Sequence, residues 1–208
     1  MPSYKLTYFD CRYMFEMVRL MFAATDTEFE EDRLDMEYKQ FKELKSTGKL
    51  PLGQVPILEV DGRLMIQSRA IQRYVAREVG MYGSNNLECL IIDEVTETFD
   101  ELLADAAPWL YREKDPEKKA ELEKEYLEEK GPRRLKYLEK KLESSGTGFF
   151  VGSKMTLADL AVFNILDILN DRMPAVIANY PALLALKAKV ESDEKIAKYL
   201  SARPKTSM

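Results

Sequence analysis

Hydrophobic residues change their spacing near residue 80, and this change limits the possible folds more than any other feature of the sequence. Before residue 80, apolar runs with the alternation of β-strands are separated by stretches with the spacing of amphipathic helices; after it, only the helical spacing continues. The pattern predicts an α/β domain over residues 1–80 and an all-α domain over residues 87–208. Between them, the turn-rich stretch GMYGSNN predicts a linker at residues 81–86.

The first domain is expected to run in the order βαβ and then ββα. Its opening segment, KLTYFDCRYMFEMVRLMFAA, contains a strand that stops at Asp10 and then an amphipathic helix, so Tyr8 lies where the strand ends. In VPILEVDGRLMIQ, two apolar runs flank Asp61-Gly62, which predicts a β-hairpin, and Ser68 is expected to cap the next helix. The expected elements are strands at residues 4–9 and 29–34, helices around 14–21 and 36–46, the hairpin at 55–67 and a helix at 68–79.

The second domain is expected to contain only helices. Asp115 followed by Pro116 is typical of a helix start, with the aspartate as N-cap and the proline in the first turn. The segment MTLADLAVFNILDIL is apolar nearly all round and predicts a buried central helix. Thr156 and Asp159 have the spacing of a capping box at its start, which indicates a structural role. The helices are expected at residues 87–110, 116–143, 155–169, 181–191 and 193–201.

The composition of the 208 residues excludes several kinds of chemistry. Without histidine, neither a Ser-His-Asp nor a Cys-His catalytic group can form. With only two cysteines and no histidine, neither a disulfide scaffold nor a Cys/His zinc site is expected, so we expect no metal. A net charge of −5 does not favour nucleic-acid binding. No apolar run approaches the roughly 20 residues of a membrane span, and MPSYK lacks the apolar core of a secretion signal, so we expect a cytoplasmic protein with no membrane partner.

Three short motifs each allow a structural and a functional reading. A proline that enters a strand, as in Gln54-Val55-Pro56, is either a simple connection or a place where the backbone is presented to a ligand. Gln67-Ser68 lies at a strand-to-helix junction, where backbone N–H groups suit a carboxylate, although an N-cap serine needs no ligand. Cys11 is either a nucleophile near a helix start or a small apolar filler.

Together these segments resemble the cytosolic glutathione transferases, specifically the sigma class, which includes the haematopoietic prostaglandin D synthases, helminth and insect enzymes and the S-crystallins. The resemblance covers essentially the whole chain. It implies a thioredoxin-like first domain, glutathione as co-substrate, a homodimer and a small hydrophobic electrophile as second substrate. The segments that carry it are SYKLTYF, KLPLGQVPILEVDG, QSRAIQRYVARE, YGSNNLE, APW at residues 107–109, GFFVGSKMTLADL and IAKYLSARPKTSM.

The resemblance also implies roles for particular residues. The tyrosine at the end of the first strand, here Tyr8, donates a hydrogen bond to the glutathione sulfur and favours its thiolate. The backbone of Val55 pairs with the cysteinyl amide of glutathione, and Asp100 reaches its α-ammonium group from the partner subunit. The remaining implied positions are Gln67 and Ser68 for the γ-glutamyl carboxylate, Lys45 with Phe41 at the glycyl end, Gln54 beside Val55, and Tyr13, Met14 and Trp109 in the electrophile pocket.

The turn after the first strand departs from the family pattern. Where family members commonly have Gly-Arg-Gly-Arg-Ala-Glu, this chain has CRYMFE, so Tyr13 replaces the second glycine and Met14 the second arginine. Loss of a cation near a developing anion costs about 1–3 kcal/mol, which predicts a transferase of reduced activity. Two alternatives remain: a non-catalytic protein of this fold, either structural or a binder of glutathione or hydrophobic molecules, and a protein that uses Cys11 to form mixed disulfides.

Overall fold

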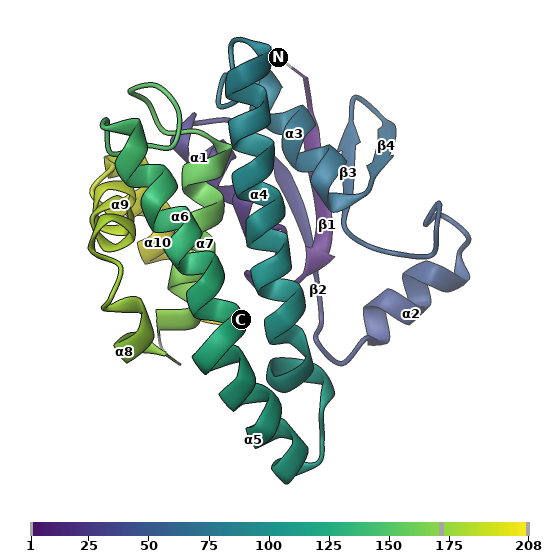
Figure 1. The fold of residues 1–208 in the computed structure, drawn as a ribbon. Coiled ribbons are helices and arrows are strands. Elements are labelled where there is room, and N and C mark those ends of the chain that lie inside the picture. Colours follow the sequence, from purple (N-terminus) through teal and green to yellow (C-terminus); the bar gives the residue numbers. More distant parts are fainter. Residues whose placement is uncertain (1, 171–172, 207–208) are drawn as a thin grey trace. The chain divides into compact units, whose positions relative to one another are not determined.

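The strands of the first eighty residues form one four-stranded mixed sheet in the computed structural model, which describes residues 2–170 and 173–206 (Figure 1). β1 pairs in parallel with β2 and antiparallel with β3, and β3 and β4 form the predicted hairpin. Asp61 and Gly62 turn that hairpin with φ of 48° and 80°, the conformation that a two-residue hairpin loop requires. In the order β2-β1-β3-β4, the strands are β1 (Tyr4–Phe9), β2 (Glu30–Leu34), β3 (Ile57–Val60) and β4 (Arg63–Ile66). The sheet confirms the predicted thioredoxin-like βαβ-ββα domain.

Helix α1 (Glu16–Ala24) covers one face of this sheet. The side chains of β1 that point to this face are buried, and those on the other face are half-buried. On the buried face, Tyr4 meets Phe22 of α1 with ring centroids 4.9 Å apart, and Tyr8 meets Phe15 at 5.4 Å. α1 also packs against α3 (Ser68–Glu78) and against α10 (Glu194–Ala202) near the C-terminus.

Helix α2 (Lys39–Ser46) contacts β1 on its other face, where the ring centroids of Phe9 and Phe41 are 5.5 Å apart. It begins at Lys39, three residues later than the sequence predicts. The reason is local: Asp35 accepts hydrogen bonds from the backbone N–H groups of Lys39 and Gln40, and Tyr38 has a left-handed φ of 64° that a helix cannot include.

The second unit is helical and is built around α7. Of the fourteen residues of α7, twelve are buried, as expected for a central helix, and α7 packs against α4 and α9 (Figure 1). None of the helices within the described ranges has the length and apolarity needed to cross a bilayer. The helices are α4 (Asn86–Ala107), α5 (Pro116–Glu125), α6 (Gly131–Ser145), α7 (Leu157–Asn170), α8 (Pro174–Ile177) and α9 (Pro181–Glu191).

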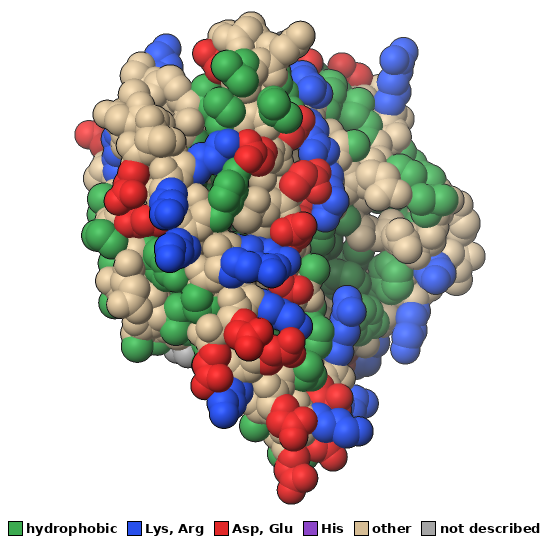
Figure 2. Space-filling model, viewed as in Figure 1, with side chains coloured by type: hydrophobic (Ala, Val, Ile, Leu, Met, Phe, Trp, Pro, Cys, Tyr) green, Lys and Arg blue, Asp and Glu red, His purple; other side chains and the backbone are tan. Residues whose placement is uncertain are grey.

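Two π-helical segments interrupt helices that the sequence predicts as regular. One, η1 (Pro108–Arg112), follows α4, and the other, η2 (Tyr126–Lys130), joins α5 to α6. Pro108 and Pro132 have no N–H for the usual bond to the carbonyl four residues before, so the regular ladder is broken at both places. On the surface of α5 and α6, acidic and basic side chains are interspersed (Figure 2).

Asp159 organises the start of α7. Its Oδ2 accepts hydrogen bonds from the backbone N–H and the hydroxyl of Thr156, at 2.7 and 2.8 Å, and its Oδ1 accepts one from the N–H of Phe150 at 2.9 Å. Asp159 is fully buried. The carboxylate therefore satisfies three buried polar groups.

Internal contacts divide the chain into two units at two places: one, after Met81, lies in the expected linker, and the other, after Ser192, is not indicated by the sequence. Residues up to Met81 group with those from Asp193 onward, and Tyr82–Ser192 form the helical unit. The pattern of the sequence instead predicts one all-α domain over residues 87–208. The difference arises because Ile196 of α10 is buried and α10 packs on α1, contacts that no local pattern in the sequence specifies.

Candidate functional site

A cavity of about 160 Å³ lies at the end of β1 and brings together most of the residues singled out in the first domain. Its walls come from β1, from the loop before β3 and from the junction of β4 with α3. The lining residues are Tyr8, Met14, Leu52, Gln54, Val55, Pro56, Ile66, Gln67 and Ser68. Segments separated by about fifty residues in sequence thus meet at one place, as the four-stranded sheet requires.

Tyr8 supplies a protonated phenol to this cavity. The side chain is 7% exposed, and its ring is held by Phe9 and Phe15. Burial raises the pKa of Tyr8 far above its ordinary value, Cys11 and Tyr13 add to the effect, and Arg19 opposes it. A phenol in this state cannot act as a base at neutral pH, but it can donate a hydrogen bond to an anion.

The turn after β1 places Cys11 beside that phenol. The Cys11 side chain is 5% exposed and forms a side-chain hydrogen bond with Tyr8. Burial raises the pKa of Cys11 to about 11, and the Arg19 charge only partly offsets it. Cys11 is therefore a thiol at neutral pH, which disfavours its reading as an activated nucleophile.

Tyr13 and Met14 form the other half of the turn. Tyr13 has a φ of 24°, in the region that favours glycine, so it occupies a strained position of the kind that the family pattern fills with glycine. Met14 lines the cavity, and its backbone carbonyl accepts a hydrogen bond from Gln72 at 2.7 Å. The residue at the position of the family arginine therefore lines the cavity and carries no charge.

The other walls of the cavity offer backbone and polar groups. The peptide bond between Val55 and Pro56 is cis, and both residues line the cavity. Gln67 has a φ of 74°, a conformation that is uncommon for a non-glycine residue. Ser68 is the first residue of α3 rather than its cap, and α3 starts with no side-chain capping hydrogen bond. Its N-terminal N–H groups suit an anionic group of a ligand.

Phe41 and Lys45 lie together on α2, beside the loop that leads into the cavity. Lys45 Nζ is 5.9 Å from the centroid of the Phe41 ring, a cation–π contact. The Lys45 side chain also lies against Gly53, where an added Cβ would come within 3.0 Å of Lys45 Cε. Neither residue is part of the cavity wall, but Lys45 lies against Gly53, the residue before the lining residue Gln54.

Asp100 and Trp109 belong to the helical unit. Asp100 lies on α4 and is 6% exposed, and Trp109 lies in η1 and is 4% exposed. The Trp109 ring packs against Tyr126, with centroids 5.6 Å apart. Their expected roles toward glutathione and the electrophile remain predictions.

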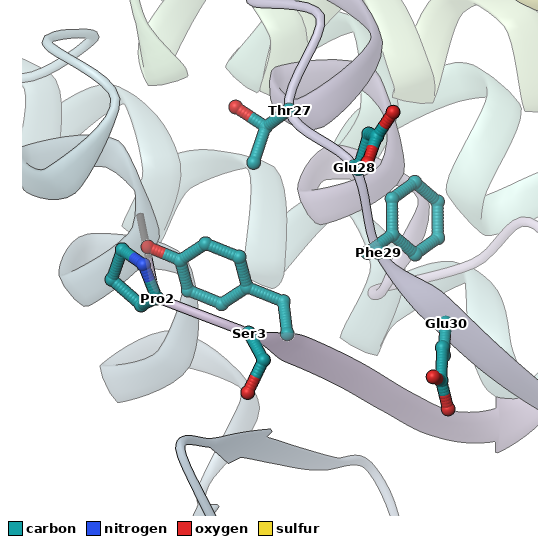
Figure 3. Close-up of a pocket in the computed structure, with 7 residues that line it drawn as sticks. Pro2, Ser3, Thr27, Glu28, Phe29 and Glu30 are labelled. Carbon is teal, nitrogen blue, oxygen red and sulfur yellow. The ribbon is translucent and has the colours of Figure 1, made fainter.

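A larger cavity lies at the opposite end of β1 and has no comparable chemistry. Figure 3 shows this space of about 660 Å³, which is lined by Pro2, Ser3, Tyr4 and residues 27–30. Glu28 and Glu30 make it acidic, so it does not suit an anionic ligand. The smaller cavity at Tyr8 is the better candidate site despite its size.

Sequence reasoning missed the residue that holds the site turn. Arg19 lies in the apolar helix α1 and is fully buried, yet its Nη1 donates a 2.6 Å hydrogen bond to the carbonyl of Cys11. The signal was a single arginine among the helical positions of Met17, Val18 and Met21. Leu52 and Ile66, which complete the cavity wall, gave no signal beyond their apolar character.

Two family descriptions match the chain. Residues 4–77 match the description "Glutathione S-transferase, N-terminal domain", and residues 100–203 match "Glutathione S-transferase, C-terminal domain". Together these matches cover most of the chain.

Individual proteins are similar to the chain over its full length. S-crystallin SL11 of Nototodarus sloanii is 36% identical, and the haematopoietic prostaglandin D synthase of Gallus gallus is 37% identical, each over 100% of both chains. The solved prostaglandin synthase D of Nilaparvata lugens has a TM-score of 0.88 at 35% identity, covering 99% of this chain and 100% of that one. Monomeric Na-GST-3 of the hookworm Necator americanus has a TM-score of 0.86 at 28% identity, with 99% and 100% covered.

Proposed function

Because this chain belongs to the glutathione S-transferase family and is similar to its sigma-class members, we propose that it binds glutathione at the Tyr8 cavity and joins its sulfur to hydrophobic electrophiles or isomerises them. The observation that carries the proposal is the buried, protonated phenol of Tyr8 facing a cavity whose other walls are Val55-Pro56 and Gln67-Ser68.

The proposed chemistry needs a donor and no base within the protein. A free thiol has a pKa of about 8.5, so only a few per cent of glutathione is thiolate at neutral pH. The O–H of Tyr8 would donate a hydrogen bond to the thiolate and lower that pKa, and each unit is worth about 1.4 kcal/mol. The proton of the thiol passes to solvent water. The sulfur lone pair then forms a bond to the electrophilic carbon, and in a displacement the leaving group departs with the electrons of the bond that breaks.

Groups around Tyr8 would hold the rest of the tripeptide. The N-terminus of α3, with Gln67 and Ser68, would bind the γ-glutamyl carboxylate, and the backbone of Val55 would pair with the cysteinyl amide. Lys45, beside Phe41 and the Gly53 loop, would bind the glycyl carboxylate. Asp100 of a second subunit would pair with the α-ammonium group, so the active unit would be a homodimer.

A second function, binding without efficient turnover, is favoured by the Met14 side chain. Met14 lines the cavity at the place where the family pattern has an arginine, so one cation that would stabilise the thiolate is replaced by a neutral thioether. S-crystallin SL11 is among the proteins similar to this chain. On this reading, glutathione binds with family-like affinity and conjugation is slow.

Glutathione titration calorimetry and an aryl-halide conjugation assay on the same sample test both readings. Tyr8→Phe should keep most binding and lose turnover by about 10- to 100-fold, because it removes one charge-assisted hydrogen bond to the thiolate. Tyr4→Phe is the matched control, since Tyr4 lies on the same strand, on the same face and is similarly buried. If wild-type protein binds no glutathione, or if Tyr8→Phe conjugates as fast as wild type, the proposed role of Tyr8 is wrong.

A further inference from the structure

Arg19 fixes the backbone that immediately follows Tyr8. The guanidinium is 0% exposed; its Nη1 donates to the carbonyl of Cys11 at 2.6 Å and its Nη2 to the carbonyl of Phe9 at 3.4 Å. These two carbonyls lie on either side of Asp10, at the point where the strand turns. Arg19 therefore holds the backbone on both sides of Asp10, within three residues of Tyr8.

Carboxylates on two sides hold Arg19 itself. Its Nε donates to Glu31 at 2.6 Å, and its Nη1 lies 3.2 Å from Oε2 of Glu16. Glu31 also accepts a hydrogen bond from Arg33, which in turn pairs with Asp10. The buried arginine is thus charge-compensated, as a guanidinium away from water must be.

The second oxygen of Glu16 is occupied by the C-terminal segment. Oε1 accepts a hydrogen bond from the Tyr199 hydroxyl at 3.0 Å and another from Arg203 Nη1 at 2.8 Å. Tyr199 lies on α10, and Arg203 is its C-cap. A separate contact joins Arg12, within the site turn, to the backbone carbonyl of Thr206 at 3.5 Å. The C-terminal segment therefore reaches the turn by two routes, through Glu16 and Arg19 and through Arg12.

We propose that residues Tyr199–Thr206 form a positioning element of the thiol site, which holds Glu16 and, through it, the Arg19 clamp on the turn after Tyr8. The inference rests on the proposed function. A buried ionic network is weak evidence for stability, since apolar residues of similar volume pack as well, but it imposes directional contacts. Those contacts end at the Phe9 and Cys11 carbonyls, so the direction they impose is that of the Tyr8 turn.

Two variants of α10 and one control test the proposal. Tyr199→Phe removes only the hydroxyl that reaches Glu16, and Arg203→Met removes the cation with little change in length. Lys195→Met is the control, because Lys195 lies on the same helix and forms its exposed ion pair with Asp26 and not with Glu16. Binding is measured with S-methylglutathione, which has no thiol, and thiolate formation is measured by the ultraviolet absorbance of bound glutathione as a function of pH.

Tyr199→Phe and Arg203→Met should each raise the pKa of the bound glutathione thiol by about one, which is a tenfold loss of thiolate stabilisation. Turnover should fall about tenfold, which is less than the roughly 100-fold loss of rate that a displacement of one ångström can cause. The affinity for S-methylglutathione should stay within about twofold of the wild-type value. Lys195→Met should leave both quantities unchanged. Arg203→Lys keeps a cation near Glu16 and should therefore recover most of the turnover that Arg203→Met loses. This recovery would show that the loss in Arg203→Met does not come from misfolding.

The possible outcomes distinguish the proposed function from the positioning role of Tyr199–Thr206. Wild-type protein that binds no S-methylglutathione overturns the proposed function and this inference with it. Wild-type protein that binds, with an unchanged thiol pKa in Tyr199→Phe and Arg203→Met, overturns the positioning role alone, even if both variants unfold at lower urea. A loss in Lys195→Met equal to that in Tyr199→Phe would also overturn it, because the effect would then come from helix docking in general.

Discussion

Cys11 shows at the scale of one residue how burial decides the chemistry of a side chain. It sits beside Tyr8 and near the Arg19 charge, yet desolvation dominates and raises the pKa of its thiol to about 11. Iodoacetamide should therefore modify the half-buried Cys89 faster than Cys11 at pH 7.5. The rate of Cys11 modification should rise about tenfold for each pH unit between pH 7.5 and 11, because the thiolate fraction rises by that factor. Mass spectrometry of the alkylated peptides measures both rates. Modification of Cys11 at pH 7.5 as fast as that of Cys89 would restore the mixed-disulfide reading.

Tyr13 and Met14 carry the second prediction at this scale. Tyr13→Gly suits the positive φ at this position, and Met14→Arg returns a cation to the cavity wall. The double variant should raise conjugation by about 10- to 100-fold and glutathione affinity much less, because the cation acts on the developing thiolate. Tyr13→Gly with Met14→Gln, which has similar length and no charge, is the control. Wild-type turnover equal to that of ordinary sigma-class enzymes, unchanged by the double variant, would show that the departure is harmless.

At the scale of an element, the start of α7 depends on Asp159. Asp159→Ala leaves three buried donors on Thr156 and Phe150 without an acceptor, which should lower the free energy of unfolding by about 3 kcal/mol or more. Asp115→Ala, at the exposed N-cap of α5, should cost only about 1 kcal/mol because water replaces the lost acceptor. Urea unfolding followed by circular dichroism compares the two. Equal losses would mean that burial of the cap has no energetic consequence.

For the whole molecule, the expectation is a homodimer in which Asp100 completes the partner's glutathione site. Asp100→Ala should weaken glutathione binding about tenfold, since it removes one member of a charge pair, and should not unfold the protein. Analytical ultracentrifugation gives the mass and calorimetry the affinity, with Glu97→Ala on the same helix as control. The hookworm Na-GST-3, which is monomeric, shows that the fold also occurs without a dimer. A monomeric form of this chain that binds glutathione as tightly as other family members would contradict the expectation.

Much of the fold is written in local sequence patterns. The alternation in Tyr4–Phe9, the Asp61-Gly62 turn and the apolar Leu157–Asn170 helix each predict an element that the structure contains, because strand, turn and helix preferences act over a few residues. Whole-chain resemblance in motif order and spacing also identifies the family and, within it, the two unusual residues Tyr13 and Met14. Composition alone removes histidine chemistry. These conclusions need no knowledge of which distant segments meet.

Only the tertiary structure decides how those elements form a site. It brings Tyr8, Val55 and Ser68 to one cavity, shows that Cys11 is buried against Tyr8, and assigns α10 to the first unit. The bond between Glu16 and Tyr199 spans 183 positions of the sequence, and no periodicity in either segment predicts it. Such contacts depend on burial and direction in three dimensions, which raise the pKa of Cys11 and hold the ring of Tyr8 between Phe9 and Phe15.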